Sequence, residues 1–352
     1  MATKDETGGT QDEKNYGYAE QIDVCLIGPT RVGKTSLLAT MHQQLQDYLP
    51  HNVQFKPLNN TLFLKLTQKY RELEKMADVP PHSLAVSDDE GTQGIQTYPF
   101  GFNFVPPEGE PDKFLQVNFH DTPGSYTSAL REELLDKVNS SQVIINAVDA
   151  GVMMEAAREN AVIYNGYDQV ARILDDSFVD ARNRLVLMVP IKAETWIGDG
   201  QGGQNGANPL IRRAEDHLAP IMKLFNFENR LGIVVPVETM GCVRFLTTFP
   251  DGKGGETIHY ARTNGKFQPR YIHFPLLYTL YFITAEYYRS RGFIRRLFHR
   301  YISSYTDLVK ALEEAEESIG AAPPPMSVHG NRRLLDFALG ARKDRLGRIT
   351  PE

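Results

Sequence analysis

Cysteine is rare in this sequence: Cys25 and Cys242 are the two cysteines among 352 residues. Two thiols so far apart exclude the disulfide-rich class of small secreted proteins, whose cores are too small to fold without crosslinks. Cys25 also lies within an apolar run that is typical of a buried strand. We therefore expect reduced, buried thiols and a cytoplasmic location.

Excess positive charge is also missing, because 38 basic and 44 acidic residues give a net charge of -6. This balance provides no attraction between the whole molecule and nucleic acid, so we expect no nucleic-acid partner. Any site for a polyanion must then be local.

Long hydrophobic runs are missing as well. The helical pattern over 275–288 is rich in Leu, Tyr and Phe, but its length of about 14 residues falls short of the roughly 20 that a membrane span requires. Residues 1–20 contain no apolar segment of the kind found in signal peptides, and their composition is typical of a disordered tail. We expect a packed helix over 275–288, and neither a signal peptide nor a membrane anchor.

Hydrophobic residues make up 41% of the chain, which is enough for a large core. Continuous apolar runs predict strands buried on both faces, and alternating residues in 98–104 and 115–119 predict an antiparallel hairpin. We expect an α/β fold: a mostly parallel, doubly wound sheet with one antiparallel edge hairpin, plus C-terminal helices. The apolar runs are 143–148, 185–191 and 231–235, and the helical patterns are 36–49, 58–76, 153–178 and 209–225.

The turn-rich stretches divide the chain into one large domain, interrupted by two insertions, and a C-terminal extension. The first insertion ends in a Pro-, Ser- and Gly-rich loop, and the second contains turn signals that predict a small β excursion. The expected units are a disordered tail over 1–20, a domain over 21–290 with insertions near 50–95 and 243–271, a helical extension over 291–320, and a Pro-rich linker with a basic tail over 321–352.

The segment G-P-T-R-V-G-K-T at 28–35 fits the phosphate-loop pattern G-x-x-x-x-G-K-[ST]. In such a loop the glycines let backbone N–H groups surround phosphate oxygens, Lys34 reaches the β- and γ-phosphates, and Thr35 binds Mg²⁺. A predicted strand precedes the segment, and the predicted helix after it adds its positive dipole. We expect contacts with nucleotide from Gly28, Pro29, Thr30, Arg31, Val32, Gly33, Lys34, Thr35 and Ser36.

A second element, D-T-P-G at 121–124, ends the predicted strand 115–119. Asp121 lies at a carboxyl strand end, where α/β sheets bind ligands, and the N–H of Gly124 can approach a γ-phosphate because no Cβ obstructs it. Thr92 and Thr97 are alternatives for a switch threonine on Mg²⁺, and we prefer Thr92 because its loop can order and disorder. The predicted metal ligands are Thr35, Thr92 and Asp121, and the predicted catalytic residues are Lys34, Thr35, Asp121 and Gly124.

These two elements resemble the first and third motifs of the translation-factor-related (TRAFAC), Ras-like GTPases. The strand end V-D-A at 148–150 further resembles bacterial GTPases, of the kind called double-GTPases of conflict systems. The resemblance covers about 22–288 and implies a P-loop NTPase that binds GTP and GDP with Mg²⁺. It also implies slow GTP hydrolysis, a molecular switch, and a protein effector or activating partner.

The base-specifying motif differs from the family's N-K-x-D. Here the strand ends in P-I-K-A-E at 190–194, so Lys192 and Glu194 keep the chemical types at the same offset. By resemblance, Glu194 contacts the guanine N1–H and amine, Lys192 covers the purine, and the backbone N–H of Met240 or Gly241 meets the guanine O6. The alternative interpretation is an ordinary Lys and Glu in solvent after a strand.

The group that orients the attacking water is not evident in the sequence. Where Ras-like enzymes commonly have Gln, this chain has Ser125, which is too short. Strand alternation directs His120 to the face opposite Asp121, so we expect a structural role for it. Turnover should then be slow unless a partner supplies an arginine, and we expect Arg31 to face solvent or a partner rather than act in cis.

Two other functions stay open: a nucleotide-gated interaction or scaffold module with little hydrolysis, and an ATP or NTP hydrolase with relaxed base specificity. Residues 289–302 interleave arginines with apolar side chains at helical spacing. This pattern fits a helix packed on the domain, and it also fits a contact with a protein, with RNA or with a membrane surface. In the last case the protein would be peripheral to a membrane.

Overall fold

The computed structural model describes residues 18, 20–46, 49, 53–81, 94–104, 112–124, 128–156, 158–197, 208–250, 256–290, 326–331 and 334. Several expectations lie outside these residues: most of the tail 1–20, the switch threonine Thr92, the residue Ser125, the extension 291–320 and most of the final tail.

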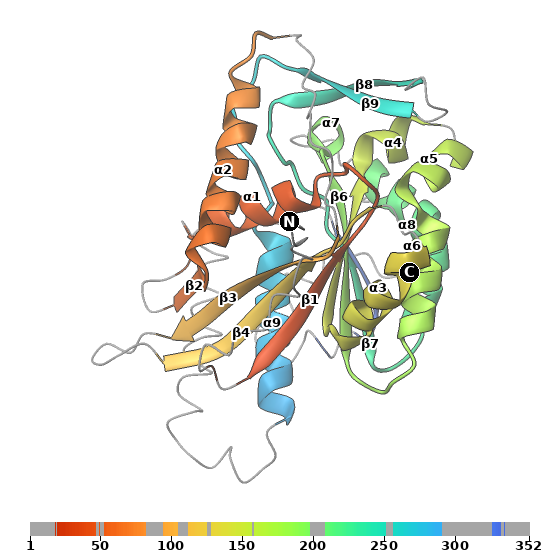
Figure 1. Cartoon of the computed structure of the whole chain (residues 1–352). Coiled ribbons are helices and arrows are strands. Elements are labelled where there is room, and N and C mark those ends of the chain that lie inside the picture. The colour runs from red at the N-terminus through yellow and green to blue at the C-terminus, as the bar shows by residue number, and fades with distance from the viewer. Residues whose placement is uncertain are drawn as a thin grey trace, which may run out of the picture.

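The central sheet has the strand order β10-β7-β6-β5-β1-β4-β3-β2 (Figure 1). Five neighbouring strands are parallel, which confirms the expected α/β class with a mostly parallel sheet. They are β4 (Asp112–Asp121), β1 (Gln21–Ile27), β5 (Val143–Asp149), β6 (Arg184–Ile191) and β7 (Arg230–Val234).

The expected antiparallel hairpin is present, but the expectation that it is the single antiparallel element is wrong, because antiparallel strands close both edges of the sheet. On one side β3 (Gln96–Phe104) pairs with β4, and β2 (Val53–Pro57) adds a further strand. On the other side β10 (Ser327–Gly330), inside the expected linker and tail, pairs with β7. Both unexpected strands are short: β2 alternates apolar and polar residues over only Val53 to Lys56, and β10 shows no clear alternation, so pairing with a neighbour decides their conformation.

Helices cover both faces of the sheet, and alternate residues of β1 enter two separate cores. On one face Val24 and Leu26 pack with α1 (Lys34–Gln46), α2 (Asn60–Ala77) and α9 (Phe274–Ser290). On the other face Cys25 and Ile27 pack with α3 (Ser128–Ser140), α6 (Tyr167–Ser177) and α8 (Pro209–Met222), the last continued by the 3-10 turn Lys223–Phe225. Cys25 and Cys242 are free and buried, as expected, and burial raises the pKa of both thiols.

The long helical pattern over 153–178 divides into three helices: α4 (Ala150–Glu155), α5 (Arg158–Asn165) and α6. The second break is at Gly166, whose φ of 62° is left-handed. Glycine adopts this conformation without the steric cost of a Cβ, so the chain can turn between α5 and α6.

The second insertion forms the expected β excursion, a two-stranded sheet of β8 (Val243–Pro250) and β9 (Glu256–Arg262). It lies beyond the carboxyl end of β6, near α4 and the short helix α7 (Glu194–Ile197), at the top of Figure 1. A third buried cluster joins it to the end of α2 and the loop after β7: Leu73, Ala77, Met240, Cys242, Val243 and Tyr260.

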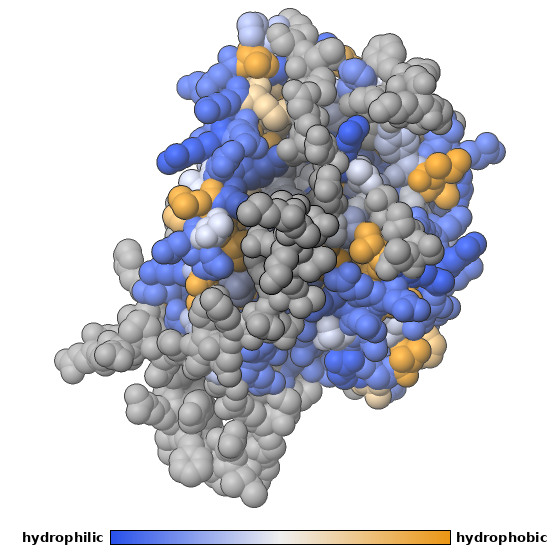
Figure 2. Space-filling model, in the orientation of Figure 1, coloured by the Kyte–Doolittle hydropathy of each residue, from blue (hydrophilic) through white to orange (hydrophobic). Residues whose placement is uncertain are grey.

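Helix α9 packs against the sheet with Leu277, Leu280 and Ile283 fully buried, which confirms a packed helix in this position. Among the helices of the described residues, none has both the length and the hydropathy to cross a bilayer. On the face in Figure 2, hydrophobic residues lie as separate spots among hydrophilic ones, and isolated exposed hydrophobics of this kind are ordinary.

Candidate functional site

The phosphate-loop segment connects the end of β1 to the start of α1 at the carboxyl edge of the parallel strands. Gly28 has φ 143° and lies against β5, where a Cβ would be 2.3 Å from the carbonyl oxygen of Ala147. A side chain at this position would therefore push the loop off the sheet. Arg31 has a φ of 61°, unusual for a residue with a side chain, and is exposed.

Lys34 is held inside this loop. Its side chain is 5% exposed, and Nζ donates to the carbonyl oxygens of Gly28 and Pro29, both at 3.0 Å. Burial lowers the pKa of Lys34 to about 8, although the nearby Asp121 carboxylate acts in the other direction. An ammonium in such surroundings favours an anionic ligand, since burying a charge without a full counter-charge is costly.

Thr35 and Asp121 meet although 86 positions separate them: Thr35 Oγ1 donates to Asp121 Oδ2. Asp121 is fully buried at the end of β4, and Thr122 Oγ1 donates to the Leu26 carbonyl at 2.7 Å. At Gly124 a Cβ would lie 1.9 Å from the Thr30 backbone nitrogen, so the segment 121–124 lies directly against the phosphate-loop segment. The two predicted motifs are therefore brought together.

A hydroxyl and a carboxylate are the oxygen donors that Mg²⁺ takes in nucleotide sites, where water and phosphate complete its six ligands. The pair Thr35 and Asp121 fits that chemistry, and Lys34 fits the phosphate. Within the described part of the chain, His, Cys, Asp and Glu form no group of three or more that would hold a metal alone.

His120 lies on the face opposite Asp121, which confirms the expectation from strand alternation. It is fully buried, Nδ1 is 2.9 Å from Thr97 Oγ1, and Nε2 is 3.0 Å from Asp23 Oδ1. Burial raises the pKa of Asp23, but the hydrogen bond and charge of His120 outweigh this, so the pKa lies below its usual value. Thr97 is engaged on this far face, which argues against it as the magnesium threonine.

At the other end of the site, Glu194 lies beside the loop after β7. Glu194 Oε1 accepts from the backbone N–H groups of Met240 at 2.9 Å and Gly241 at 3.2 Å. Glu194 Oε2 is buried without a hydrogen-bond partner. Burial raises the pKa of Glu194 to about 7, with the two amides acting against the rise. The backbone N–H groups of Met240 and Gly241, which were expected to contact the guanine O6, are therefore hydrogen-bonded to Glu194. Glu194 is the carboxylate that was expected to contact the same base.

Lys192 has a φ of 55°, and its Nζ donates to Asp149 Oδ2 at 2.9 Å. With this bond and the buried Glu194 Oε2, the interpretation of Lys192 and Glu194 as ordinary solvated residues is wrong. Asp149 and Tyr260 are not evident as site residues from the sequence alone, although Tyr260 donates to Asp149 Oδ1. The position of Asp149 at a strand end could have indicated a site residue. By contrast, no local sequence feature indicates that a tyrosine 111 positions away contacts it.

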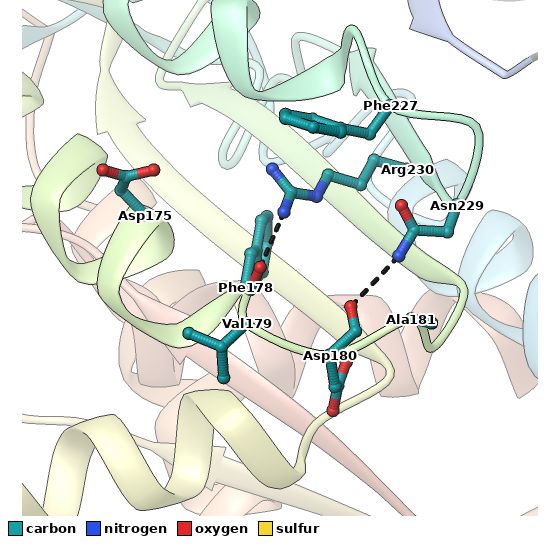
Figure 3. A pocket seen from close by; sticks show the side chains of 8 residues that line it. All are labelled: Asp175, Phe178, Val179, Asp180, Ala181, Phe227, Asn229 and Arg230. Carbon is teal, nitrogen blue, oxygen red and sulfur yellow. Dashed lines mark hydrogen bonds between the residues drawn. The ribbon is translucent and has the colours of Figure 1, made fainter.

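The hollow in Figure 3 lies elsewhere, at the amino ends of β6 and β7. Arg230 is stacked between Phe178 and Phe227, with its guanidinium 4.9 and 4.3 Å from the two ring centres, and it donates to the Phe178 carbonyl. These contacts hold the loop after α6, and the hollow contains none of the predicted site residues.

Comparison with models of known protein families finds no match, and a search of curated proteins finds no significant relative. The chemistry of the site is therefore inferred from its residues and their geometry.

Proposed function

We propose that this protein is a P-loop NTPase that binds GTP with Mg²⁺, hydrolyses it slowly and acts as a molecular switch. The observation that carries the proposal is the convergence of three distant segments at one edge of the sheet: the phosphate loop with buried Lys34, the Thr35–Asp121 pair, and Glu194 with a buried oxygen that lacks a partner.

Lys34 and the loop amides would neutralise the β- and γ-phosphates, because phosphoryl transfer depends mainly on positioning and charge stabilisation. Thr35 Oγ1 and Asp121 would hold Mg²⁺, which supplies positive charge to the phosphate oxygens. The backbone N–H of Gly124 is next to the loop and would contact the γ-phosphate.

Glu194 supports guanine as the base. A carboxylate oxygen accepts, and guanine offers two donors on one edge, N1–H and the exocyclic amine; adenine has an acceptor at N1. The buried Glu194 Oε2 would gain the partner it lacks. Lys192, two positions before Glu194 in the chain, would cover the purine.

Two observations favour the other candidate functions. His120 faces away from the phosphates, so it cannot orient the attacking water, and this supports a nucleotide-gated interaction module with little hydrolysis.

The pKa of Glu194 near 7 supports relaxed base specificity, because a protonated carboxyl can donate to adenine N1.

The test is calorimetric binding of GTP and ATP with and without Mg²⁺, followed by single-turnover hydrolysis. Wild type should bind GTP more tightly than ATP, and Lys34→Ala should abolish tight binding without unfolding the protein. Lys65→Ala, which removes an exposed lysine on α2, is the matched control. Wild-type affinity in Lys34→Ala would exclude the phosphate-loop function.

A further inference from the structure

A buried tyrosine of the β8–β9 insertion lies at the base end of the site. Tyr260, on β9, donates its hydroxyl to Asp149 Oδ1, and its ring centre lies 4.6 Å from Lys192 Nζ. Lys192 Nζ in turn donates to Asp149 Oδ2 at 2.9 Å. The lysine ammonium is therefore held between a carboxylate and an aromatic face, both favourable partners for a cation.

Asp149 is the centre of this arrangement, and it is fixed from several sides. Its side chain is 1% exposed, and Oδ1 also accepts from the Val152 N–H at 3.1 Å, which caps α4. Its backbone N–H donates to Asn165 Oδ1 at 2.8 Å. Because Asp149 is fixed in this way, Tyr260 and Lys192 bind a rigid partner.

Tyr260 itself is fixed by packing. It belongs to the buried cluster that joins α2, the loop after β7 and the insertion, and the Phe245 ring packs edge-on against it at 5.9 Å. At Gly151 a Cβ would lie 2.7 Å from the Tyr260 hydroxyl oxygen, so the backbone of α4 passes directly beside the tyrosine. Burial and the nearby carboxylates raise the pKa of Tyr260, so the hydroxyl stays protonated and donates.

A lysine stem that must cover a base loses rotamer freedom when the nucleotide binds, and this loss weakens binding. If the ammonium is already held, part of that loss has occurred before binding. We propose that Tyr260 is a positioning residue, which acts with Asp149 to hold Lys192 in place for stacking on the purine, so that the β8–β9 insertion is part of the base site. This inference rests on the proposed function.

The test separates the base from the phosphates by comparing GTP with inorganic tripolyphosphate, which needs the phosphate loop alone. Tyr260→Phe keeps the ring and removes the hydroxyl; we expect about 3- to 10-fold weaker GTP binding and unchanged tripolyphosphate binding. In a Lys192→Met background, which keeps the stem but has no ammonium, Tyr260→Phe should have no further effect. Tyr278→Phe, which removes a buried hydroxyl on α9, is the matched control and should leave both affinities unchanged.

The outcomes of this test distinguish the role of Tyr260 from the proposed nucleotide-binding function. Wild-type GTP affinity in Tyr260→Phe, an equal loss for GTP and tripolyphosphate, or an undiminished effect in the Lys192→Met background would each overturn the role of Tyr260 and leave nucleotide binding in place. If the wild-type protein bound neither GTP nor tripolyphosphate, the proposed function and this inference would both be wrong.

Discussion

Lys34 is a cation held in a loop of carbonyl groups, and its protonation should control the affinity of the site for phosphate. Burial lowers its pKa to about 8 in the free protein, and phosphate binding favours the charged form, so binding raises that pKa. Affinity should therefore be full below pH 8 and fall above it, approaching about tenfold per pH unit.

This dependence is measurable by titrating tripolyphosphate between pH 7 and 9.5. The matched variant is Lys34→Arg. Its guanidinium stays charged over this range, so the contribution of lysine deprotonation to the pH dependence is removed. The same slope in both proteins would show that the phosphate, rather than Lys34, titrates.

Glu194 should make base preference depend on pH. With a pKa raised to about 7 it is ionised above that pH and can accept from guanine; below it, the protonated carboxyl suits adenine N1. GTP affinity should thus rise with pH up to about 7 and then level off, while ATP affinity changes in the opposite direction.

Competition binding of GTP and ATP at pH 6 and 8 checks this expectation. Glu194→Gln should remove the pH dependence, and Glu159→Gln, on the exposed side of α5, should retain it. Glu194→Asn should also favour xanthosine triphosphate, whose C2 carbonyl accepts from an amide. A constant ratio of GTP to ATP affinity across this range would exclude Glu194 from the base site.

Asp121 should govern the magnesium dependence of binding. Replacing it with Asn removes the charge opposite Thr35, and changes of this kind around a metal typically reduce metal affinity by about 10- to 100-fold. The measurement is a Mg²⁺ titration of GTP binding, with Asp136→Asn on the exposed side of α3 as the control. A Mg²⁺ midpoint equal to that of wild type would remove Asp121 from the metal site.

At the scale of secondary structure, the break between α5 and α6 depends on Gly166. Its left-handed φ is unfavourable for alanine, so Gly166→Ala should lower the free energy of unfolding by roughly 1 to 2 kcal/mol. Gly166→Asn should cost less, because asparagine tolerates this conformation. Urea unfolding measures both, and an alanine variant as stable as wild type would contradict a left-handed turn here.

The helices, strands and loops that are determined by their own local sequence could be predicted. The strand, loop and helix around Lys34 follow from an apolar run and a motif with a known mechanism, and the position of His120 on the face opposite Asp121 follows from alternation along β4. The antiparallel hairpin and the excursion at β8–β9 follow from turn residues between alternating strands.

Features that depend on distant partners were not predictable. The short strands β2 and β10 exist because an edge of the sheet is available to pair with them. The link from Tyr260 to Asp149 requires the insertion to fold back over the sheet, and the bond between Glu194 and the amide of Met240 requires two loops to meet. Local periodicity contains no information about such contacts.

On the scale of the whole molecule, two parts of the chain that are remote in sequence meet in one buried cluster: the end of α2, and the loop after β7 with the β8–β9 insertion that follows it. Because these segments share the cluster, neither insertion is an independent appendage. A ligand that binds the folded form should therefore stabilise all three segments together, by about 2.7 kcal/mol when its concentration is 100 times its dissociation constant.

We expect strand β10 to limit self-association of the protein. It covers the backbone of β7, pairing from Ser327 with Val234 to Gly330 with Leu231. A chain cut after residue 325 would leave that row of N–H and C=O groups unpaired, next to the apolar Leu231 and Ile233, and unpaired edges of this kind recruit strands from other molecules. We expect the shortened protein to form larger species in light scattering at concentrations where the full chain does not, so the last part of the sequence would determine how the protein behaves in a crowded solution.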